Sequence, residues 1–268
     1  MNFKNKCYLM GILNITTDSF FDGNKYFEKN KAIEHGLKMV EDGADIIDIG
    51  GESTKPNAIK VSPDEEINRL IDIICSIKKY KNICVSVDTY KSQVAKEVLE
   101  NGADIINDVY GGLYDENMFE LVKKYDSHIC ITHNRLDNIN KFSNVVEETY
   151  NELNIRYNEA LNQGVKKEKI ILDPGLGFSK YGYNNVLLIQ NISKFKEFNI
   201  PLLVGISRKK FLNLLDGIDP LYSNKSTISV NAYMASLGIN ILRVHDVKEH
   251  KKIIDVINSI VYGGISIE

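Results

Sequence analysis

Hydrophobic residues along this chain gather in short uninterrupted runs rather than in alternating patterns. Each run has the length of a β-strand and ends near a polar residue or a glycine, as in KIILDPG at 169–175. A run without polar alternation is typical of a strand buried on both faces, as in a parallel sheet covered by helices. Strands are therefore expected at 7–13, 45–49, 83–88, 102–107, 128–133, 169–173, 201–205 and 240–243.

Between these runs, apolar residues recur with the spacing of one helical face. The stretch 33–40 has this spacing, and Ser62, Pro63 and Glu65 form the pattern of a capping box that starts the next helix. Further helices are expected at 91–101, 115–124, 145–163 and 185–198, before Gly238, and at 246–261.

Eight strand–helix units without a linker favour a single domain over residues 1–268. The sequence GADII occurs at 43–47 and again at 102–106, so the same local pattern twice ends a helix and starts a strand. Parallel strands need crossover connections, which the expected helices supply. The pattern therefore predicts an α/β fold: one (β/α)8 TIM barrel with its ligand site at the carboxyl ends of the strands.

The composition excludes some classes of partner. Lys and Arg number 33 against 36 Asp and Glu, a net charge of −3, which gives no sign of nucleic acid or of an anionic membrane as partner. No apolar run approaches the length of a membrane span, and the first ten residues lack a signal-peptide pattern.

The four scattered cysteines fit free thiols in a reducing compartment, so a cytoplasmic location is expected.

Three of the strand ends present hydrogen-bond acceptors. Asp88, Asn107 and Asp173 would meet at one end of the barrel and suit a neutral heterocycle rich in N–H donors. Each also has a simpler interpretation. Asp173 would form only a turn, Asp88 would cap the helix that follows, and Asn107 would bond loop backbone. His133 ends a further strand, either as a ligand-binding group or as a structural one.

Cationic and donor groups come from other strand ends. Arg243 and His245 are two residues apart in a strand pattern, so their side chains project to the same side. Burying unpaired charge is costly, which makes such groups unusual as core filler. Together with Lys209 and Lys55 they would compensate a multiply charged anion such as a diphosphate. The pattern thus indicates a pocket with an anion end and a donor-rich-ring end.

At this point the chain resembles a known family, the dihydropteroate synthases of folate biosynthesis. The resemblance extends from Gly11 to about Val247, and the motifs follow in the family's order. They are GILNITTDSF at 11–20, GGESTKP at 50–56, SVDT at 86–89, NDVYGG at 107–112, DPGLGF at 173–178, SRK at 207–209 and RVHD at 243–246.

The resemblance implies a transferase that joins 4-aminobenzoate to 6-hydroxymethyl-7,8-dihydropterin diphosphate and releases diphosphate, with Mg²⁺ as cofactor. It implies that Asp88, Asn107 and Asp173 hold the edge of the pterin and that Lys209 lies against its far side. Asn14 would touch the Mg²⁺. Barrels of this family are commonly homodimers, so a dimer is expected.

The same resemblance assigns the remaining site residues. Thr54, Arg243 and His245 would take the diphosphate end of the substrate. The loop 16–23, with Asp22, and the loop around Lys55 would close to form the aminobenzoate pocket. Asp88, Lys209 and Asp22 would then be the catalytic residues.

Physical chemistry favours a dissociative substitution in such a pocket. Departure of diphosphate leaves a cation at the pterin methylene, conjugated with the ring. Carboxylates near the ring stabilise that cation, and Mg²⁺, Arg and His stabilise the leaving group. The reaction needs no protein nucleophile, and the amine arrives last.

The chain departs from the family pattern in its two loops, at Thr17, Phe21, Asn24, Lys55 and Asn57. The family usually has Pro, Ser, Gly, Arg and Gly there, and its sensitivity to sulfonamides depends on the same loops. None of the pterin residues departs. Two other interpretations stay open: a barrel that transfers a methyl group from methyltetrahydrofolate to a corrinoid protein, and a pterin-binding protein that has lost catalysis. The methyl-transfer barrel needs the pterin acids but no diphosphate cluster.

Overall fold

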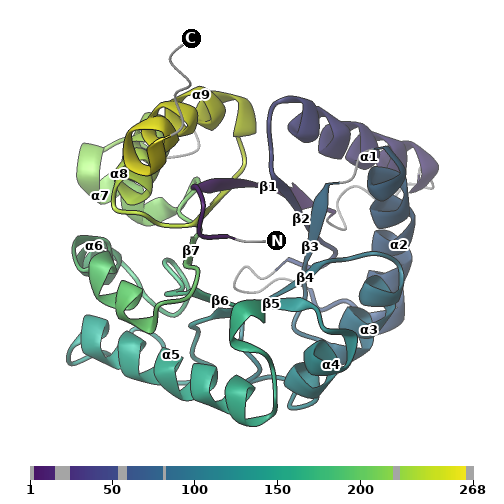
Figure 1. Cartoon of the computed structure of the whole chain (residues 1–268), viewed down its shortest axis with the longest axis horizontal. Coiled ribbons are helices and arrows are strands. Elements are labelled where there is room, and N and C mark those ends of the chain that lie inside the picture. Colours follow the sequence, from purple (N-terminus) through teal and green to yellow (C-terminus); the bar gives the residue numbers. More distant parts are fainter. Residues whose placement is uncertain (1–2, 16–24, 54–58, 81–82, 220–223, 264–268) are drawn as a thin grey trace.

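The structure is a computed structural model that describes residues 3–15, 25–53, 59–80, 83–219 and 224–263. Eight strands alternate with helices along the chain (Figure 1). The strands are β1 (Tyr8–Asn14), β2 (Ile46–Gly50), β3 (Cys84–Asp88), β4 (Ile105–Asp108), β5 (His128–Thr132), β6 (Ile170–Asp173), β7 (Leu203–Val204) and β8 (Ile241–Val244).

All neighbouring strands pair in parallel, in the order β6-β5-β4-β3-β2-β1-β8-β7. The ring closes between β6 and β7, where a parallel bridge joins Leu172 to Leu202 and the Leu172 N–H donates to the Pro201 carbonyl at 3.0 Å. Helices surround this ring in Figure 1. The predicted α/β barrel is therefore confirmed, and strand positions agree to within about three residues at each end.

The helices also follow the prediction, with one difference. The expected helix at 185–198 is two pieces, because the α-helix ends at Gln190 and the chain continues after Asn191 as a 3-10 helix. The helices are α1 (Lys25–Glu41), α2 (Pro63–Tyr80), α3 (Ser92–Glu100), α4 (Met118–Tyr125), α5 (Val145–Asn162), α6 (Tyr183–Gln190), η3 (Ile192–Phe198), α7 (Asn213–Asp216), α8 (Lys225–Ser236), α9 (Val247–Asn258) and a π-helical turn, η5 (Ser259–Gly263).

The predicted capping box before α2 is half present. The Ser62 hydroxyl accepts a hydrogen bond from the Glu65 N–H at 3.3 Å, as an N-cap side chain does. The Glu65 carboxylate turns instead to the Arg69 guanidinium, an i,i+4 ion pair along the helix. None of the helices within the described residues is both long and apolar enough to cross a membrane.

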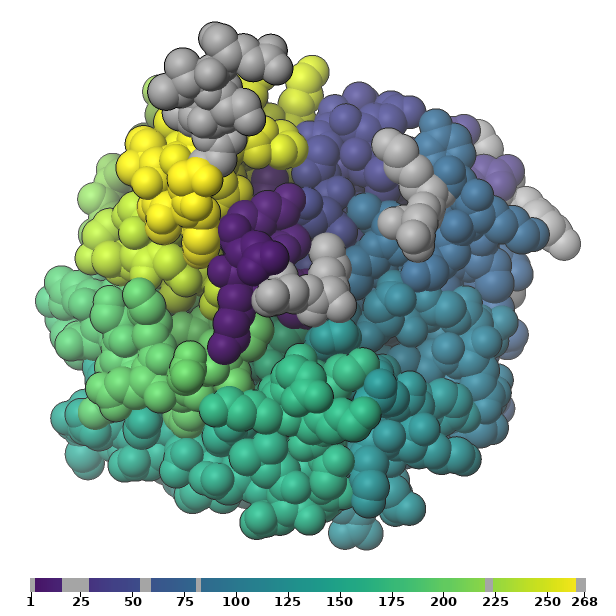
Figure 2. Space-filling model, in the orientation of Figure 1, coloured from purple at the N-terminus to yellow at the C-terminus, as the bar shows by residue number. Residues whose placement is uncertain are grey.

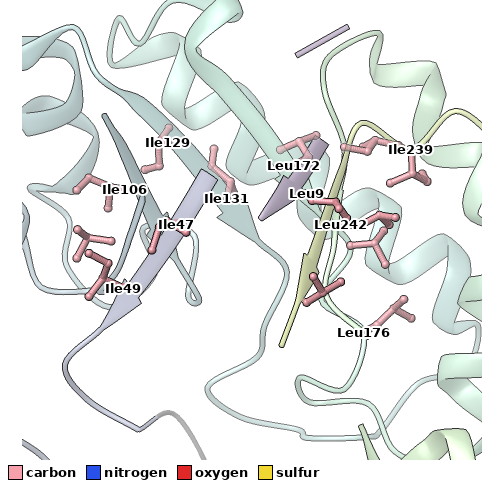
Figure 3. Close-up of a cluster of buried hydrophobic side chains, with 14 of the residues drawn as sticks. Leu9, Ile47, Ile49, Ile106, Ile129, Ile131, Leu172, Leu176, Ile239 and Leu242 are labelled. Atoms are coloured by element: carbon pink, nitrogen blue, oxygen red, sulfur yellow. The ribbon is translucent and has the colours of Figure 1, made fainter. Parts of the chain in front are cut away.

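Side chains on the outer face of the sheet pack against the helices. Figure 3 shows this cluster, with side chains such as Ile47, Ile106, Ile129 and Leu172 pointing from the strands toward the helical layer. Each of these four side chains has no exposed surface. At roughly 1.5–3 kcal/mol for each large apolar side chain, this layer supplies most of the driving force that holds helices to sheet.

The barrel interior consists of stacked layers of side chains. Strands β2, β4, β6 and β8 contribute four isoleucines, all fully buried: Ile46, Ile105, Ile171 and Ile241. Side chains two residues apart on a strand face the same side, so the next layer toward the carboxyl ends comes from the residues two positions later. That layer is wholly polar: Asp48, Asn107, Asp173 and Arg243. We call it the polar layer.

Aromatic side chains close the opposite, amino end of the barrel. Phe3 is buried and meets Tyr8 and His128 edge-on, with ring centroids 5.6 and 5.3 Å away. In Figure 2 the N-terminal residues, in purple, lie over the centre of the ring. A ligand therefore has access to the interior only from the carboxyl ends of the strands.

Candidate active site

An ion-pair network lies at the centre of the polar layer. The Arg243 Nε donates to Asp48 Oδ2 at 2.6 Å, and Arg243 Nη2 donates to Asp88 Oδ2 at 2.8 Å. Asp88 stands at the end of β3, where it is the register partner of Asn107 on β4. Asp88 is therefore not a helix cap, because the N-cap of α3 is Lys91. The simpler interpretation of Asp88 is wrong.

Burial and charge shift the protonation of this network. Desolvation raises the pKa of Asp88 to about 7, against the opposing effect of Arg243, and the nearby carboxylate of Asp48 raises it further. Burial lowers the pKa of Arg243, but Asp48 and Asp88 outweigh it and raise the pKa overall. The guanidinium thus stays charged while Asp88 titrates near neutrality.

Asn107 belongs to the same network. Its Nδ2 donates to Asp48 Oδ2 at 3.1 Å, so its side chain does not bond loop backbone. Two carboxylate oxygens nearby, Asp48 Oδ1 and Asp88 Oδ1, are buried and have no hydrogen-bond partner within the described part of the chain. Buried oxygens of this kind usually have a partner. Asp88 keeps 8% of its surface exposed, so a ligand can supply a donor to its Oδ1, whereas Asp48 has no exposed surface.

Asp173 does form a turn, and it also belongs to the polar layer. Its Oδ1 accepts the Gly175 N–H at 2.8 Å, and it is 5% exposed. Burial raises its pKa, which Lys209 opposes. A β-carbon on Gly175 would lie 1.9 Å from the His133 carbonyl oxygen, so only glycine fits in this turn. The turn thus fixes the carboxylate at the barrel mouth.

Lys209 lies across the same loop. Its ammonium group donates to the Leu176 carbonyl and sits 4.4 Å from the centre of the Phe178 ring. Desolvation lowers its pKa to about 8, against the opposing effect of Asp173. A β-carbon on Gly177 would come within 2.6 Å of Lys209 Cδ, so the glycine makes room for the lysine. A half-buried cation with this pKa is able to hold or release a proton near neutral pH.

His245 directly follows β8, two residues after Arg243. Its Nδ1 and the Ser207 Oγ are 3.0 Å apart, and its backbone N–H donates to the same hydroxyl at 3.2 Å. Between Ser207 and Lys209, Arg208 adopts φ +58°, a conformation uncommon for a non-glycine residue. Its guanidinium is held by Asp246 at 2.9 Å. On either side of this turn, Ser207 contacts His245 and Lys209 contacts the loop after β6.

Arg243 occupies a different place from the one expected. The sequence analysis put it with His245 at an anion end, apart from the acids. In the structure its guanidinium contacts Asp48 and Asp88, because two buried carboxylates require a compensating charge. Asn14 is exposed at the end of β1. A β-carbon placed on Gly50 would lie 3.5 Å from Asn14 Oδ1 and 3.5 Å from Asp88 Cβ, so Asn14 and Asp88 lie on either side of this glycine.

A second network, which sequence reasoning missed, supports the loop after β6. Lys180 is 1% exposed and donates to His133 Nδ1 at 2.7 Å and to the carbonyls of Gly175 and Phe178 at 3.0 and 3.1 Å. His133 Nδ1 then accepts, so its Nε2–H donates to Glu152 at 3.0 Å. Burial and Lys180 lower the pKa of His133 to about 4. His133 is thus a structural residue.

The structure brings together Asp88, Asn107, Asp173 and Arg243, with Lys209 and His245 on adjacent loops. The predicted Asp22, Thr54 and Lys55 lie outside the described residues, as do Thr17, Phe21, Asn24 and Asn57. Asp48 was missed because it lies within β2 rather than at its end. The signal was present, since in each even-numbered strand a polar residue follows an isoleucine by two positions.

A buried polar layer at the mouth of a parallel barrel defines a ligand-binding barrel enzyme. The family model described as "Pterin binding enzyme" matches residues 10–245, and the chain belongs to this family. Sequence relatives are named accordingly. The dihydropteroate synthase of Streptococcus pyogenes serotype M6 is 41% identical over 254 residues, which cover 94% of this chain and 95% of that protein.

Solved structures agree with this result. The dihydropteroate synthase of Clostridium difficile, solved in the presence of pteroic acid, has a TM-score of 0.91 and 38% identity, and the match covers 97% of this chain and 98% of that one. The dihydropteroate synthase of Xanthomonas albilineans, solved with 4-aminobenzoic acid, has a TM-score of 0.89 and 33% identity, covering 96% and 93%.

Proposed function

We propose that this enzyme condenses 6-hydroxymethyl-7,8-dihydropterin diphosphate with 4-aminobenzoate to give 7,8-dihydropteroate and diphosphate. It is a transferase of folate biosynthesis, like the dihydropteroate synthases it resembles over most of its length. The observation that supports this function best is the polar layer with the adjoining Asp88, whose buried Oδ1 lacks a donor within the described residues. A pterin edge offers several N–H groups to such oxygens.

The pterin ring would lie on the polar layer. Asp173 and Asn107 would accept from its N–H groups, and Asp88 would face the part of the ring next to the methylene carbon. Lys209, held over the loop after β6, would cover the other side of the ring. Hydrogen bonds to charged acceptors are worth roughly 1.5–3 kcal/mol each, so two or three of them account for selective binding.

The diphosphate would extend from the ring toward the loops after β1, β2, β7 and β8. His245 and Ser207 stand at this end, and we assign Thr54 and Lys55 to it from the sequence. We also assign the Arg243 guanidinium to this set. It already donates to Asp88, and a guanidinium can bond phosphate oxygens as well as carboxylate oxygens.

The protein groups present fit a Mg²⁺ ion that is shared with the substrate. Within the described residues, no cluster of three or more His, Cys, Asp or Glu side chains is arranged to hold a metal. Mg²⁺ commonly takes one or two protein oxygens together with substrate phosphates and waters, and the exposed Asn14 amide offers one such oxygen near Asp88. When bound, the ion would neutralise charge on the departing diphosphate.

The residues of the chain suit a dissociative substitution. As the bond to diphosphate breaks, positive charge develops at the methylene carbon and spreads into the ring. An ionised Asp88 stabilises that charge, and Lys209 and Arg243 balance the negative charges that surround it. Asp22, on the loop after β1, would receive the amine of 4-aminobenzoate. The route requires no side-chain nucleophile.

The methyl-transfer alternative does not explain the groups beyond the pterin. A methyl donor needs the acids but no diphosphate-binding end, and the neighbouring Ser207 and His245 support such an end in this chain. The relatives that match nearly the whole chain are named as synthases. A protein without catalysis is distinguished by the experiment below.

We also propose a cytoplasmic location and a homodimer. All four cysteines are unpaired, as in proteins of a reducing compartment. Ile253, Val256 and Ile260 form an exposed stripe along α9 and the π-helical turn, and Tyr233 is exposed on α8, which packs against α9. A stripe of this kind is typical of a symmetric contact. Light scattering of the wild type and of Val256→Glu tests this, with a monomeric wild type contradicting it.

The test of the activity is direct. The protein is mixed with pterin diphosphate, Mg²⁺ and 4-aminobenzoate, and release of diphosphate is measured, with 4-aminobenzoate omitted as control. Release that depends on 4-aminobenzoate and yields dihydropteroate supports the function. No release above the control, from protein that binds pterin by calorimetry, would show a binding protein without catalysis.

A further inference from the structure

Asp48 lies beneath the binding surface and has no exposed area. A single oxygen, Oδ2, accepts from both Arg243 Nε and Asn107 Nδ2, at 2.6 and 3.1 Å. Asn107 and Asp173 of the same layer keep 3% and 5% of their surface exposed. Asp48 is thus the member of the polar layer that a ligand reaches only through others.

An ionised carboxylate accepts hydrogen bonds and donates none. The face of the Asn107 amide that turns to Asp48 must therefore be its nitrogen, and the amide oxygen is the atom left for a ligand. An isolated asparagine at this position would be free to present either group. The carboxylate of Asp48 removes that choice.

We propose that Asp48 is a positioning residue that locks the Asn107 amide with its oxygen toward the ligand. The Asn107 oxygen then joins the carboxylates of Asp88 and Asp173 as an acceptor, and together they select a ring whose edge bears N–H donors. A ring with a carbonyl at the same place would set oxygen against oxygen. The inference rests on the proposed pterin site and adds the origin of its ring specificity.

Asp48 does more here than neutralise Arg243. The guanidinium has a second carboxylate in Asp88, at 2.8 Å, so a counter-charge alone would not require Asp48. The hydrogen bond to Asn107 is what Asp88 does not supply. Removing Asp48 is therefore expected to change which ring is bound as well as how tightly.

Two probes distinguish these effects: pterin, and lumazine, which carries a carbonyl oxygen in place of the exocyclic amino group. Their affinities are measured at one pH by calorimetry for the wild type and for Asp48→Asn. Wild type should prefer pterin. Asn at position 48 presents either an oxygen or a nitrogen, which lets the Asn107 amide turn, so the preference should fall by about tenfold or more.

A matched control is Asp108→Asn. Asp108 is a fully buried carboxylate next to Asn107, but it accepts from the Tyr110 and Gly112 N–H groups, both at 2.8 Å. Its change should leave the ratio of the two affinities as in the wild type. The exchange variant Asp48→Asn/Asn107→Asp should restore the preference, because residue 107 again shows the ligand an acceptor oxygen.

Equal loss of both affinities in Asp48→Asn, with an unchanged ratio, would overturn the inference and leave the pterin site in place. If Asp48→Asn does not fold, the exchange variant decides: a wild-type ratio supports the inference, and a lost preference overturns it. A measurement on unaltered protein is independent of folding, since slow hydrogen exchange of the Asn107 Nδ2 group by NMR is expected and fast exchange would contradict the lock. Wild type that binds neither ring would overturn the proposed function itself.

Discussion

The two inner layers of the barrel come from the same four strands, two residues apart, and they do opposite things. The isoleucine layer of Ile46, Ile105, Ile171 and Ile241 fills the barrel and needs no partner beyond its own packing. The polar layer, with the adjoining Asp88 of β3, leaves buried oxygens without donors and holds charges whose pKa values are shifted. The isoleucine layer stabilises the fold. The fold in turn holds the polar groups in place, although some of their hydrogen bonds form only with a ligand.

The largest expected effect is a loss of stability on substituting the cation of the polar layer. Arg243→Leu leaves Asp48 and Asp88 buried without their cation. Removing one partner of a buried ion pair typically costs about 3–5 kcal/mol, so the free energy of unfolding should fall by that order. Denaturant unfolding at pH 8 measures it. The loss should shrink at pH 5, where Asp88 is protonated, and a loss independent of pH would contradict the assigned pairing.

A substitution in the isoleucine layer should also lower stability, but it should leave pterin binding nearly unchanged. Ile241→Ala, two residues before Arg243, creates a cavity and should lower the free energy of unfolding by about 2–5 kcal/mol. Affinity for pterin, measured well below the melting temperature, should stay within about threefold of the wild type, because Ile241 does not reach the binding surface. A tenfold loss of pterin affinity would show that the two layers are not independent.

The pH dependence sharpens the difference further. The folded-state pKa of Asp88, about 7, lies above its ordinary value of 3.8, so the folded protein binds the extra proton and the contribution of Asp88 to stability falls as the pH rises from about 4 to 7. Its catalytic use needs the ionised form. Values of kcat/KM should therefore rise through pH 7 and decline above pH 8 as Lys209 loses its proton.

Asp88→Asn should remove the acidic limb of that profile while lowering its maximum. The decrease in stability between pH 4 and 7 that Asp88 causes should be absent from this variant. A variant that keeps an unchanged acidic limb would assign it to another group.

The smallest expected effect concerns the anion end. Lys55 supplies one compact charge where the family usually has the bidentate fork of Arg. Lys55→Ala should lower kcat/KM for pterin diphosphate by an amount that corresponds to about 1–2 kcal/mol, and Lys55→Arg should retain or improve it. Steady-state kinetics decide. Equal values for Ala and wild type would leave the diphosphate to His245 and Arg243.

The sequence predicted the barrel because a buried parallel strand has its own signature, and the eight runs each have it. It also predicted Asp88, Asn107 and Asp173, since polar groups at the ends of buried strands stand out. Asp48 was not predicted, because a carboxylate within a strand resembles a break in the apolar run unless the residues of neighbouring strands are considered with it. The contacts of Arg243 were also missed, because the balance among several buried charges depends on distances that strand spacing does not give. The break after α6 at Asn191 has no clear signal in the apolar spacing.

The most direct test of the central claim, that the polar layer binds the pterin, is a calorimetric titration of pterin into wild type and Asp173→Asn. This change keeps the shape of the side chain and an acceptor for the Gly175 N–H. It removes a charge-assisted acceptor worth roughly 1.5–3 kcal/mol. The account predicts at least about a tenfold loss of affinity with little change in melting temperature. Unchanged affinity would show that Asp173 only forms the turn and that the ring binds elsewhere.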